Sequence, residues 1–333
     1  EDKQVTDTDI ANIISLWTGI PLSKVLESEK DILLNLDKIL HRRVVGQDYA
    51  IKAISAVIKR SRTGINDPKK PIGSFLFVGP TGVGKTELAK TLAEHLFNDE
   101  KELLSFDMSE FSEKHSISKL IGSPPGYIGF EEGGRLTKAV RNRPFKVILF
   151  DEIEKANSEI FNLFLQILDE GRLIDGQGNY VDFKNTIIIM TSNLGSEFLT
   201  GDNKEKDAKL KVQEVIKESF KPEFLNRLDD IIIFNSLTQK EVSLIINNEL
   251  NMLQKRLGEK DISINFCDSI FSYLLNKGYS KEYGARPIKR MIEKEIGTLI
   301  AESIIKENFD LTAPVAVVYE KNNISLSSKI KSH

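Results

Sequence analysis

Five short apolar runs that alternate with amphipathic helical patterns constrain the fold of this chain most strongly. The runs have four or five residues each, at positions 74–78, 103–107, 147–150, 186–190 and 230–234. Such runs are typical of strands buried on both faces of a parallel sheet. Between them, apolar residues recur on one face of two predicted helices, around 88–96 and 160–168. The alternation predicts an α/β domain with three layers, in which helices cover a parallel sheet.

The pattern differs on either side of this region. Apolar residues between 27 and 43 recur at helical spacing, and after residue 235 long helical patterns are mixed with two β-like runs, 262–266 and 315–319. We therefore expect a helical linker over 1–40, a large domain over 41–235 and a smaller α+β lid domain over 236–333. The chain starts with Glu inside a helical pattern, so we expect a fragment of a longer protein whose preceding module is missing.

Composition weakens several functional classes. There are 46 Lys and Arg against 49 Asp and Glu, and this net charge of −3 does not favour nucleic-acid binding. The single cysteine, Cys267, is best explained as a small packed residue and suggests a reducing compartment. No apolar run approaches the roughly 18 residues that span a membrane, and no signal peptide opens the chain. We expect a location in the cytoplasm, or in the mitochondrial matrix or a plastid of a eukaryote, and no secretion.

Residues 79–86 read Gly-Pro-Thr-Gly-Val-Gly-Lys-Thr and fit G-x-x-x-x-G-K-[ST] at every fixed position. Glycines let backbone N–H groups turn toward phosphate oxygens, Lys85 supplies positive charge and the Thr86 hydroxyl can ligate Mg²⁺. A chance match in a glycine-containing turn is expected in roughly one chain of this length in a hundred. The buried run before the motif and the helix after it make that alternative weaker. The predicted ATP-binding residues here are Gly82, Val83, Gly84, Lys85, Thr86 and Glu87.

Two carboxylates, Asp151 and Glu152, end the apolar run 147–150. Open α/β sheets bind ligands at the carboxyl ends of their strands. Asp151 would hold Mg²⁺, and Glu152 would polarise the water that attacks the phosphate. Taken alone, the doublet equally suits an acidic cap of the following helix. The phosphate motif upstream favours the catalytic interpretation and predicts hydrolysis of the nucleotide.

Longer strings around these motifs resemble the AAA+ modules of the Clp chaperones, and most of all the second module of ClpB-type disaggregases. They include Trp-Thr-Gly-Ile-Pro at 17–21, Arg-Val-Val-Gly-Gln at 43–47 and further strings at 107–111, 123–129 and 175–178. The resemblance therefore covers essentially the whole chain. It implies an ATP-hydrolysing motor that threads polypeptide through the pore of a ring.

The resemblance also implies roles that spacing alone would not assign. Val44 and Val45 match the adenine pocket, although they equally suggest core residues. Asn193, after the run 186–190, matches the sensor-1 position that orients the attacking water, with a neutral strand cap as the alternative. Arg227 matches the arginine finger that acts on the neighbouring subunit's site, and Arg286 matches sensor 2. Without the resemblance, these two arginines would be a surface residue and a helix-start residue.

The string 123–129 matches the pore loop, in which Tyr127 and Ile128 would grip substrate polypeptide. An aromatic side chain on a loop suits a motor that must hold any sequence, because it contacts backbone and side chains without selectivity. The ordinary alternative is an aromatic packed under a turn. Where relatives often have a second Tyr, this chain has Phe130, and we expect little consequence.

Partners follow from the same resemblance. It implies a homo-hexamer, unfolded or aggregated polypeptide as substrate, and a DnaK-type chaperone as a partner. Protease-feeding relatives carry an aliphatic-Gly-Phe tripeptide between sensor 1 and the arginine finger, and residues 194–226 contain none. We therefore predict a disaggregase with no protease partner, and keep a ClpC/ClpA-like unfoldase as the alternative. A nucleic-acid remodelling ATPase would need a basic stripe, and a non-enzymatic scaffold would tolerate loss of Glu152 or Arg227.

Overall fold

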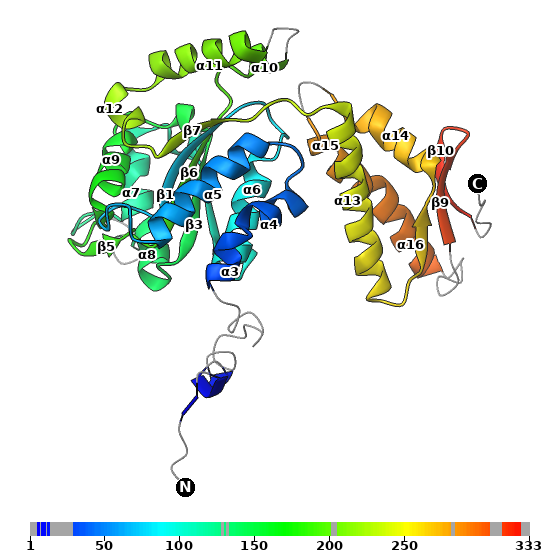
Figure 1. The fold of residues 1–333 in the computed structure, drawn as a ribbon, viewed down its shortest axis with the longest axis horizontal. Helices are drawn as coiled ribbons and strands as arrows, with labels where there is room; N and C mark the ends of the chain where they lie inside the picture. The colour runs from blue at the N-terminus through cyan, green and yellow to red at the C-terminus, as the bar shows by residue number, and fades with distance from the viewer. Residues whose placement is uncertain are drawn as a thin grey trace. The chain divides into compact units, whose positions relative to one another are not determined.

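The chain folds into two compact units (Figure 1). The computed structural model describes residues 5–6, 8–10, 12–13, 29–127, 130, 133–200, 205–280, 284–306 and 315–327. The first unit comprises residues 1–78, 85–195 and 209–233, and the second comprises 79–84, 196–208 and 234–333. The string at 17–21 and the predicted pore-loop residue Ile128 lie outside the described residues.

A five-stranded parallel sheet forms the centre of the first unit. Its strands, in spatial order, are β2 (Leu103–Asp107), β3 (Lys146–Asp151), β6 (Thr186–Ser192), β1 (Gly73–Val78) and β7 (Asp230–Ile233). Each predicted apolar run forms one of these strands. The predicted parallel sheet is thus confirmed.

Position in the sheet explains how apolar each strand is. Every residue of β1 and β6 is buried, and so is every residue of β3 except the last. These strands are the inner three, so both of their faces meet other layers. The edge strand β2 buries only Phe106 fully. Figure 1 shows α5 and α6 on one face of the sheet and α9 on the other, which gives the predicted three layers.

Helices α5, α6 and α9 pack against the central sheet. Helix α9 buries Ile160, Phe164 and Leu168, and the Phe164 ring lies 4.7 Å from that of Phe150 in β3. The described helices of the first unit are α3 (Glu29–Leu34), α4 (Leu36–Arg43), α5 (Asp48–Arg62), α6 (Lys85–Phe97), α7 (Ile117–Ile121), α8 (Arg135–Asn142), α9 (Ile160–Glu170), α12 (Pro222–Leu225) and most of α11 (Glu205–Ser219). Helix α10 (Ser196–Thr200) and the first residues of α11 belong to the second unit. Single 3₁₀ turns occupy Glu100–Glu102, Met108–Phe111, Lys114–Ser116 and Ile153–Lys155.

The helical pattern between residues 27 and 43 forms two helices, with a break at Asn35. The Asn35 side-chain amide donates to the carbonyl of Asp31 at 3.1 Å. Asparagine side chains that bond the backbone in this way compete with a continuous helix. Leu36 and Leu40 of α4 are fully buried, and α3 and α4 belong to the first unit. The end of the predicted linker is therefore packed against the large domain.

A small hairpin lies where the sequence showed no strand pattern. Strands β4 (Arg172–Ile174) and β5 (Tyr180–Asp182) pair antiparallel. Each has three residues, of which only the middle one is buried. The buried Asp175 carboxylate accepts the N–H groups of Gln177 and Asn179 and so shapes the turn between them. Strands this short carry no readable alternation, which explains why they were missed.

The second unit contains the predicted α+β domain. Its helices are α13 (Gln239–Gly258), α14 (Asp268–Gly278), α15 (Arg286–Met291) and α16 (Thr298–Lys306), with a π-helical turn at Ile292–Gly297. Its sheet has the order β10 (Asn323–Ser327), β9 (Val315–Glu320) and β8 (Ile264–Phe266). The two predicted β-like runs form β8 and β9, whereas β10 was not predicted. Cys267 is half-buried and precedes α14.

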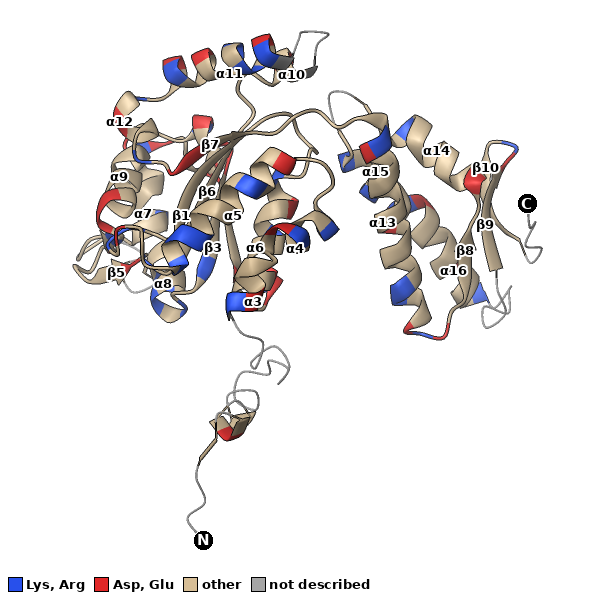
Figure 2. Cartoon of the chain, in the orientation of Figure 1, with Lys and Arg blue, Asp and Glu red and all other residues tan. Residues whose placement is uncertain are grey.

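Charges of both signs are mixed on the surface. In Figure 2, α11 and α13 each carry basic and acidic residues, so neither helix presents a stripe of one sign. Such mixing gives no support to a nucleic-acid surface on these helices. Within the described part of the chain, every helix is too short or too polar to cross a membrane.

Candidate nucleotide site

Within the first unit, the predicted site residues Lys85, Asp151, Glu152 and Asn193 lie beyond or at the carboxyl ends of three adjacent strands, β1, β3 and β6. Asp151 and Glu152 end β3, Asn193 follows β6, and the phosphate motif follows β1. Because the strands are parallel, these three ends lie on the same edge of the sheet. This is the edge at which open α/β sheets bind ligands.

The glycines of the phosphate motif meet two separate constraints. Gly82 and Gly84 have φ angles of 76° and 109°, in the left-handed region that favours glycine. Gly79 closely approaches the chain at Phe234, whose carbonyl oxygen would lie 2.5 Å from an added Cβ. Within the second unit, the N–H of Ala285 donates to the Gly82 carbonyl at 3.1 Å. The adjacent Arg286 is exposed at the start of α15.

Lys85, the first residue of α6, is a buried cation with only 8% of its surface exposed. Its Nζ donates to Asn193 Oδ1 at 2.8 Å and to the Ser192 carbonyl at 3.3 Å. Burial lowers the Lys85 pKa to about 8, although Asp151, Glu154 and Glu152 act in the opposite direction. A buried ammonium group beside strand ends is suited to an anionic ligand, because the negative charge of the ligand would offset the loss of hydration of the ammonium group.

Thr191 links the two strands that carry the acids and sensor 1. Its buried hydroxyl donates to an Asp151 carboxylate oxygen and accepts the N–H of Glu152 at 3.2 Å. Sequence reasoning had not assigned a role to this threonine. The available signal was a hydroxyl residue at the end of a buried strand, next to the predicted sensor.

Glu152 has an unusual backbone conformation, with φ 56° and ψ 53°. A non-glycine residue in this region costs about 1–3 kcal/mol and persists only where neighbours hold it. Its carboxylate accepts from the side-chain amide of Asn193 at 3.4 Å and pairs with Lys155. The hydrogen bond to Glu152 in turn raises the pKa of Lys155. Asn193 therefore contacts both Lys85 and Glu152, and the three side chains form a connected row.

The predicted adenine-pocket segment is tied to α6 by Arg43. The Nε of Arg43 donates to Glu87 at 2.9 Å, and the guanidinium also pairs with Glu94. Val44, the next residue, is buried, whereas Val45 is half-buried. The Glu87 carboxylate, predicted to bind nucleotide, is thus engaged with Arg43. This ion pair couples the segment 43–45 to the helix that begins with Lys85.

The oxygen ligands present fit a magnesium ion. Thr86 is exposed at the start of α6, and Asp151 is half-buried at the end of β3. Mg²⁺ keeps several waters and is usually held by one or two protein oxygens together with substrate phosphates. No group of three or more His, Cys, Asp or Glu side chains suited to a metal occurs among the described residues. The donors thus match a metal that is held jointly with a nucleotide.

Comparison with known proteins identifies the family. A family model described as an AAA domain (Cdc48 subfamily) matches residues 70–231, and one for the C-terminal, D2-small domain of ClpB protein matches 237–317. A chaperone protein ClpB 2 of Nostoc sp. is 52% identical over 98% of this chain and 38% of its own length. A chaperone protein ClpB of Clostridium tetani is 54% identical over 91% of this chain and 36% of its own length. The chain belongs to the ClpB family of AAA+ proteins.

Within that family the chain corresponds to the second ATPase module, as the resemblance predicted. It spans between a third and two fifths of the length of the curated ClpB relatives it matches. The AAA domain makes it an ATP-hydrolysing module.

Two predicted ClpB-type residues lie outside the strand-end cluster. Arg227 is half-buried, and its Nε pairs with Asp169 while its guanidinium lies 3.4 Å from Glu223. Asp169 was not singled out from sequence. Tyr127 is 71% exposed, which excludes the alternative of an aromatic packed under a turn within this chain.

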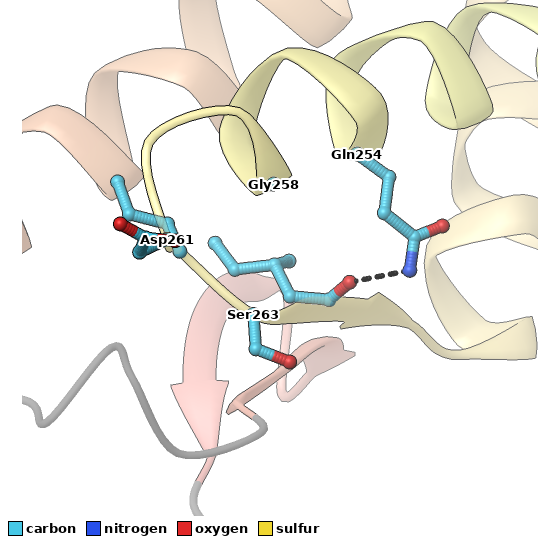
Figure 3. A pocket seen from close by; sticks show the side chains of 6 residues that line it. Gln254, Gly258, Asp261 and Ser263 are labelled. Carbon is cyan, nitrogen blue, oxygen red and sulfur yellow. Dashed lines mark hydrogen bonds between the residues drawn. The ribbon is translucent and has the colours of Figure 1, made fainter.

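An open pocket in the small domain does not belong to this site. It is lined by the end of α13 and the start of β8, where the Gln254 side chain donates to the Ile264 carbonyl at 2.7 Å (Figure 3). None of its lining residues is a predicted site residue. We assign it no function.

Proposed function

We propose that this module hydrolyses ATP to drive the threading of aggregated polypeptide in a longer, ring-forming disaggregase. The observation that carries the proposal is the row formed by Lys85, Asn193 and Glu152 across three strand ends. A group that binds phosphate and a group that polarises water are thereby connected through one amide side chain. That arrangement suits hydrolysis better than mere nucleotide storage.

Each residue of the row has a distinct task. Lys85 neutralises the β- and γ-phosphates, while the N–H groups of the motif 79–84 cradle them. Glu152 accepts a hydrogen bond from the attacking water and aligns it with the phosphorus atom. The side-chain amide of Asn193 donates to Glu152 and holds it in place. When this hydrogen bond opens, the same amide can donate to the attacking water. Thr86 and Asp151 would hold Mg²⁺, which supplies charge neutralisation at the phosphate oxygens when bound.

Arg227 is proposed to act on a neighbouring subunit. An arginine finger stabilises the charge that spreads over the transferring phosphoryl group. Because it acts in trans, it requires a closed ring, and we propose a homo-hexamer as the working state. In the single chain, the Arg227 guanidinium forms ion pairs with Asp169 and Glu223. Assembly would have to exchange these partners for the neighbour's nucleotide, so ring formation and activity would rise together.

Tyr127 is proposed to contact the substrate. Its exposed ring projects from the loop between α7 and α8, on which Ile128 follows it. The loop base is anchored, because the N–H of Gly176 donates to the Ile121 carbonyl at 2.8 Å. A bulky side chain on an anchored loop can transmit force to a polypeptide of any sequence. We further propose a DnaK-type partner and no protease partner.

Two variants test hydrolysis and threading separately. Glu152→Gln should retain nucleotide binding and lower the ATPase rate about 10²–10⁴-fold, the usual contribution of a positioned base. Glu159→Gln is the matched control, since the Glu159 carboxylate pairs with the exposed Lys114 outside the site. Normal hydrolysis by Glu152→Gln would refute the assignment of the base.

Threading is tested in the full-length ring with an unfolded fluorescent reporter. Tyr127→Ala should abolish translocation while most ATPase activity remains, because the aromatic side chain of Tyr127 contacts the substrate polypeptide and not the nucleotide. Tyr49→Ala removes another exposed aromatic, from α5, and should translocate normally. If Tyr127→Ala translocates as well as Tyr49→Ala, the proposed pore contact is wrong.

A further inference from the structure

Glu154 has a carboxylate at the nucleotide site that neither the motifs nor the family comparison accounts for. It lies in the 3₁₀ turn that follows β3, two residues beyond Glu152. One of its oxygens, Oε1, accepts the backbone N–H of Asn193 at 3.1 Å. The partners are 39 residues apart in sequence and belong to the ends of neighbouring strands. Glu154 therefore does not act as a local cap of its own turn.

Burial of the second oxygen of this carboxylate costs free energy. Glu154 Oε2 is buried and has no hydrogen-bond partner among the described residues. A buried acceptor without a partner typically costs about 1–3 kcal/mol, and more when it is charged. An unsatisfied group of this kind in a native site calls for an explanation other than stability. The neighbouring sensor residue provides one.

Asn193 can bridge the site only if its main chain is fixed. Its side-chain oxygen accepts from Lys85 at 2.8 Å, and its side-chain nitrogen donates to Glu152 at 3.4 Å. The residue lies just beyond the end of β6, where the strand's ladder no longer holds the backbone. Its N–H bonds to Glu154 instead. Without that bond the amide could turn away from either partner.

We propose that Glu154 is a positioning residue for ATP hydrolysis, whose carboxylate fixes the main chain of Asn193 and thereby the side chain that spans Lys85 and Glu152. The proposal rests on the proposed hydrolytic function and adds a residue to it. In this proposal Glu154 acts through its bond to the Asn193 main chain.

The test compares two substitutions of Glu154 in the ATPase assay. Glu154→Ala removes the acceptor, so kcat should fall about 10–100-fold, as for other outer-sphere partners of site residues. KM for ATP should change less than about threefold, because the bond matters for the transition state and not for binding. Glu154→Gln keeps an amide oxygen for the Asn193 N–H and should retain kcat within about threefold. If Gln is as damaging as Ala, charge and not the anchor matters, and the proposal is overturned.

A mutant cycle separates positioning from a general loss of structure. In an Asn193→Ala background the Glu154→Ala substitution should lower kcat no further, because no side chain remains to be positioned. Additive losses would overturn the proposal. Glu159→Ala, which removes a carboxylate from the next segment, serves as the control and should leave kcat unchanged.

Hydrogen exchange at residue 193 makes the outcome independent of catalysis. Glu154→Ala should speed exchange of the Asn193 amide, and Glu154→Gln should not, whether or not the chain hydrolyses ATP. If the wild type shows no ATPase activity but exchange responds as expected, the hydrolytic function fails while the anchor stands. If exchange at residue 193 is the same in all three proteins, the anchor itself is refuted.

Discussion

The buried Lys85 makes nucleotide affinity depend on pH in a defined direction. Without ligand its pKa is about 8, because burial outweighs the nearby carboxylates Asp151, Glu152 and Glu154. Phosphate groups favour the charged form and so raise this pKa on binding. The nucleotide therefore binds tightly while Lys85 is protonated, below pH 8. Affinity is lost as the pH rises through 8, since binding must then take up a proton.

The size of the effect follows from the fraction of protonated Lys85. With a pKa of about 8, roughly nine tenths of the molecules carry the proton at about pH 7 and one tenth at about pH 9. The dissociation constant for ADP should thus rise about tenfold over this interval, which corresponds to about 1.4 kcal/mol. Near pH 8, binding should take up about half a proton per nucleotide.

Titration calorimetry measures both quantities on the purified chain. Experiments in two buffers with different ionisation enthalpies give the proton uptake, and chelator keeps magnesium out of the comparison. Lys85→Met should bind weakly and show no dependence on pH between 7 and 9. An affinity for wild type that is equal at both ends of the interval, with no proton uptake, would show that Lys85 keeps its proton and that the effect of its burial is misjudged.

Two further variants address stability and assembly. Lys146→Met removes one of the two cations that pair with the Glu102 carboxylate, which is about one-tenth exposed, and leaves the solvent-exposed Arg143. The free energy of unfolding, measured by urea denaturation, should fall by about 2–4 kcal/mol. An unchanged midpoint would contradict this. Arg227→Ala should lower the ATPase rate of the assembled ring about 10³-fold or more. Mixing its subunits with Glu152→Gln subunits should restore part of the rate, and no recovery would argue against a finger that acts in trans.

The sequence predicted the parts of the fold that depend on local pattern. The runs 74–78, 147–150 and 186–190 became fully buried inner strands, because a strand covered on both faces must be apolar throughout. Alternation of strands and helices then required a parallel sheet. The phosphate motif and the acid doublet could be placed at the same edge, since parallel strands end on one side. Their chemistry was thus predictable before any contact was known.

The connections within the site could not be predicted in the same way. Thr191 and Asp151 are 40 residues apart, and Glu154 and Asn193 are 39 apart. Which side chains meet depends on the register between β3 and β6, and a shift of one residue would turn each side chain to the opposite face. Neither of the apolar runs 147–150 and 186–190 contains a residue pattern that determines this register. Roles for Arg227 and Tyr127 likewise came from resemblance, because a finger and a pore loop act on partners outside the chain.

The register also explains why the site is built on β3 and β6 together. Phe150 is paired with Met190, so the next residue of each strand, Asp151 in β3 and Thr191 in β6, lies at the same height. The Thr191 hydroxyl then reaches both the Asp151 carboxylate and the Glu152 N–H. The next contact along the edge joins Asn193 and Glu154. The Thr191–Asp151 and Asn193–Glu154 hydrogen bonds thus join the acid doublet to Asn193 across the two strands. A substitution that breaks either bond should therefore lower the ATPase rate more than it lowers nucleotide affinity.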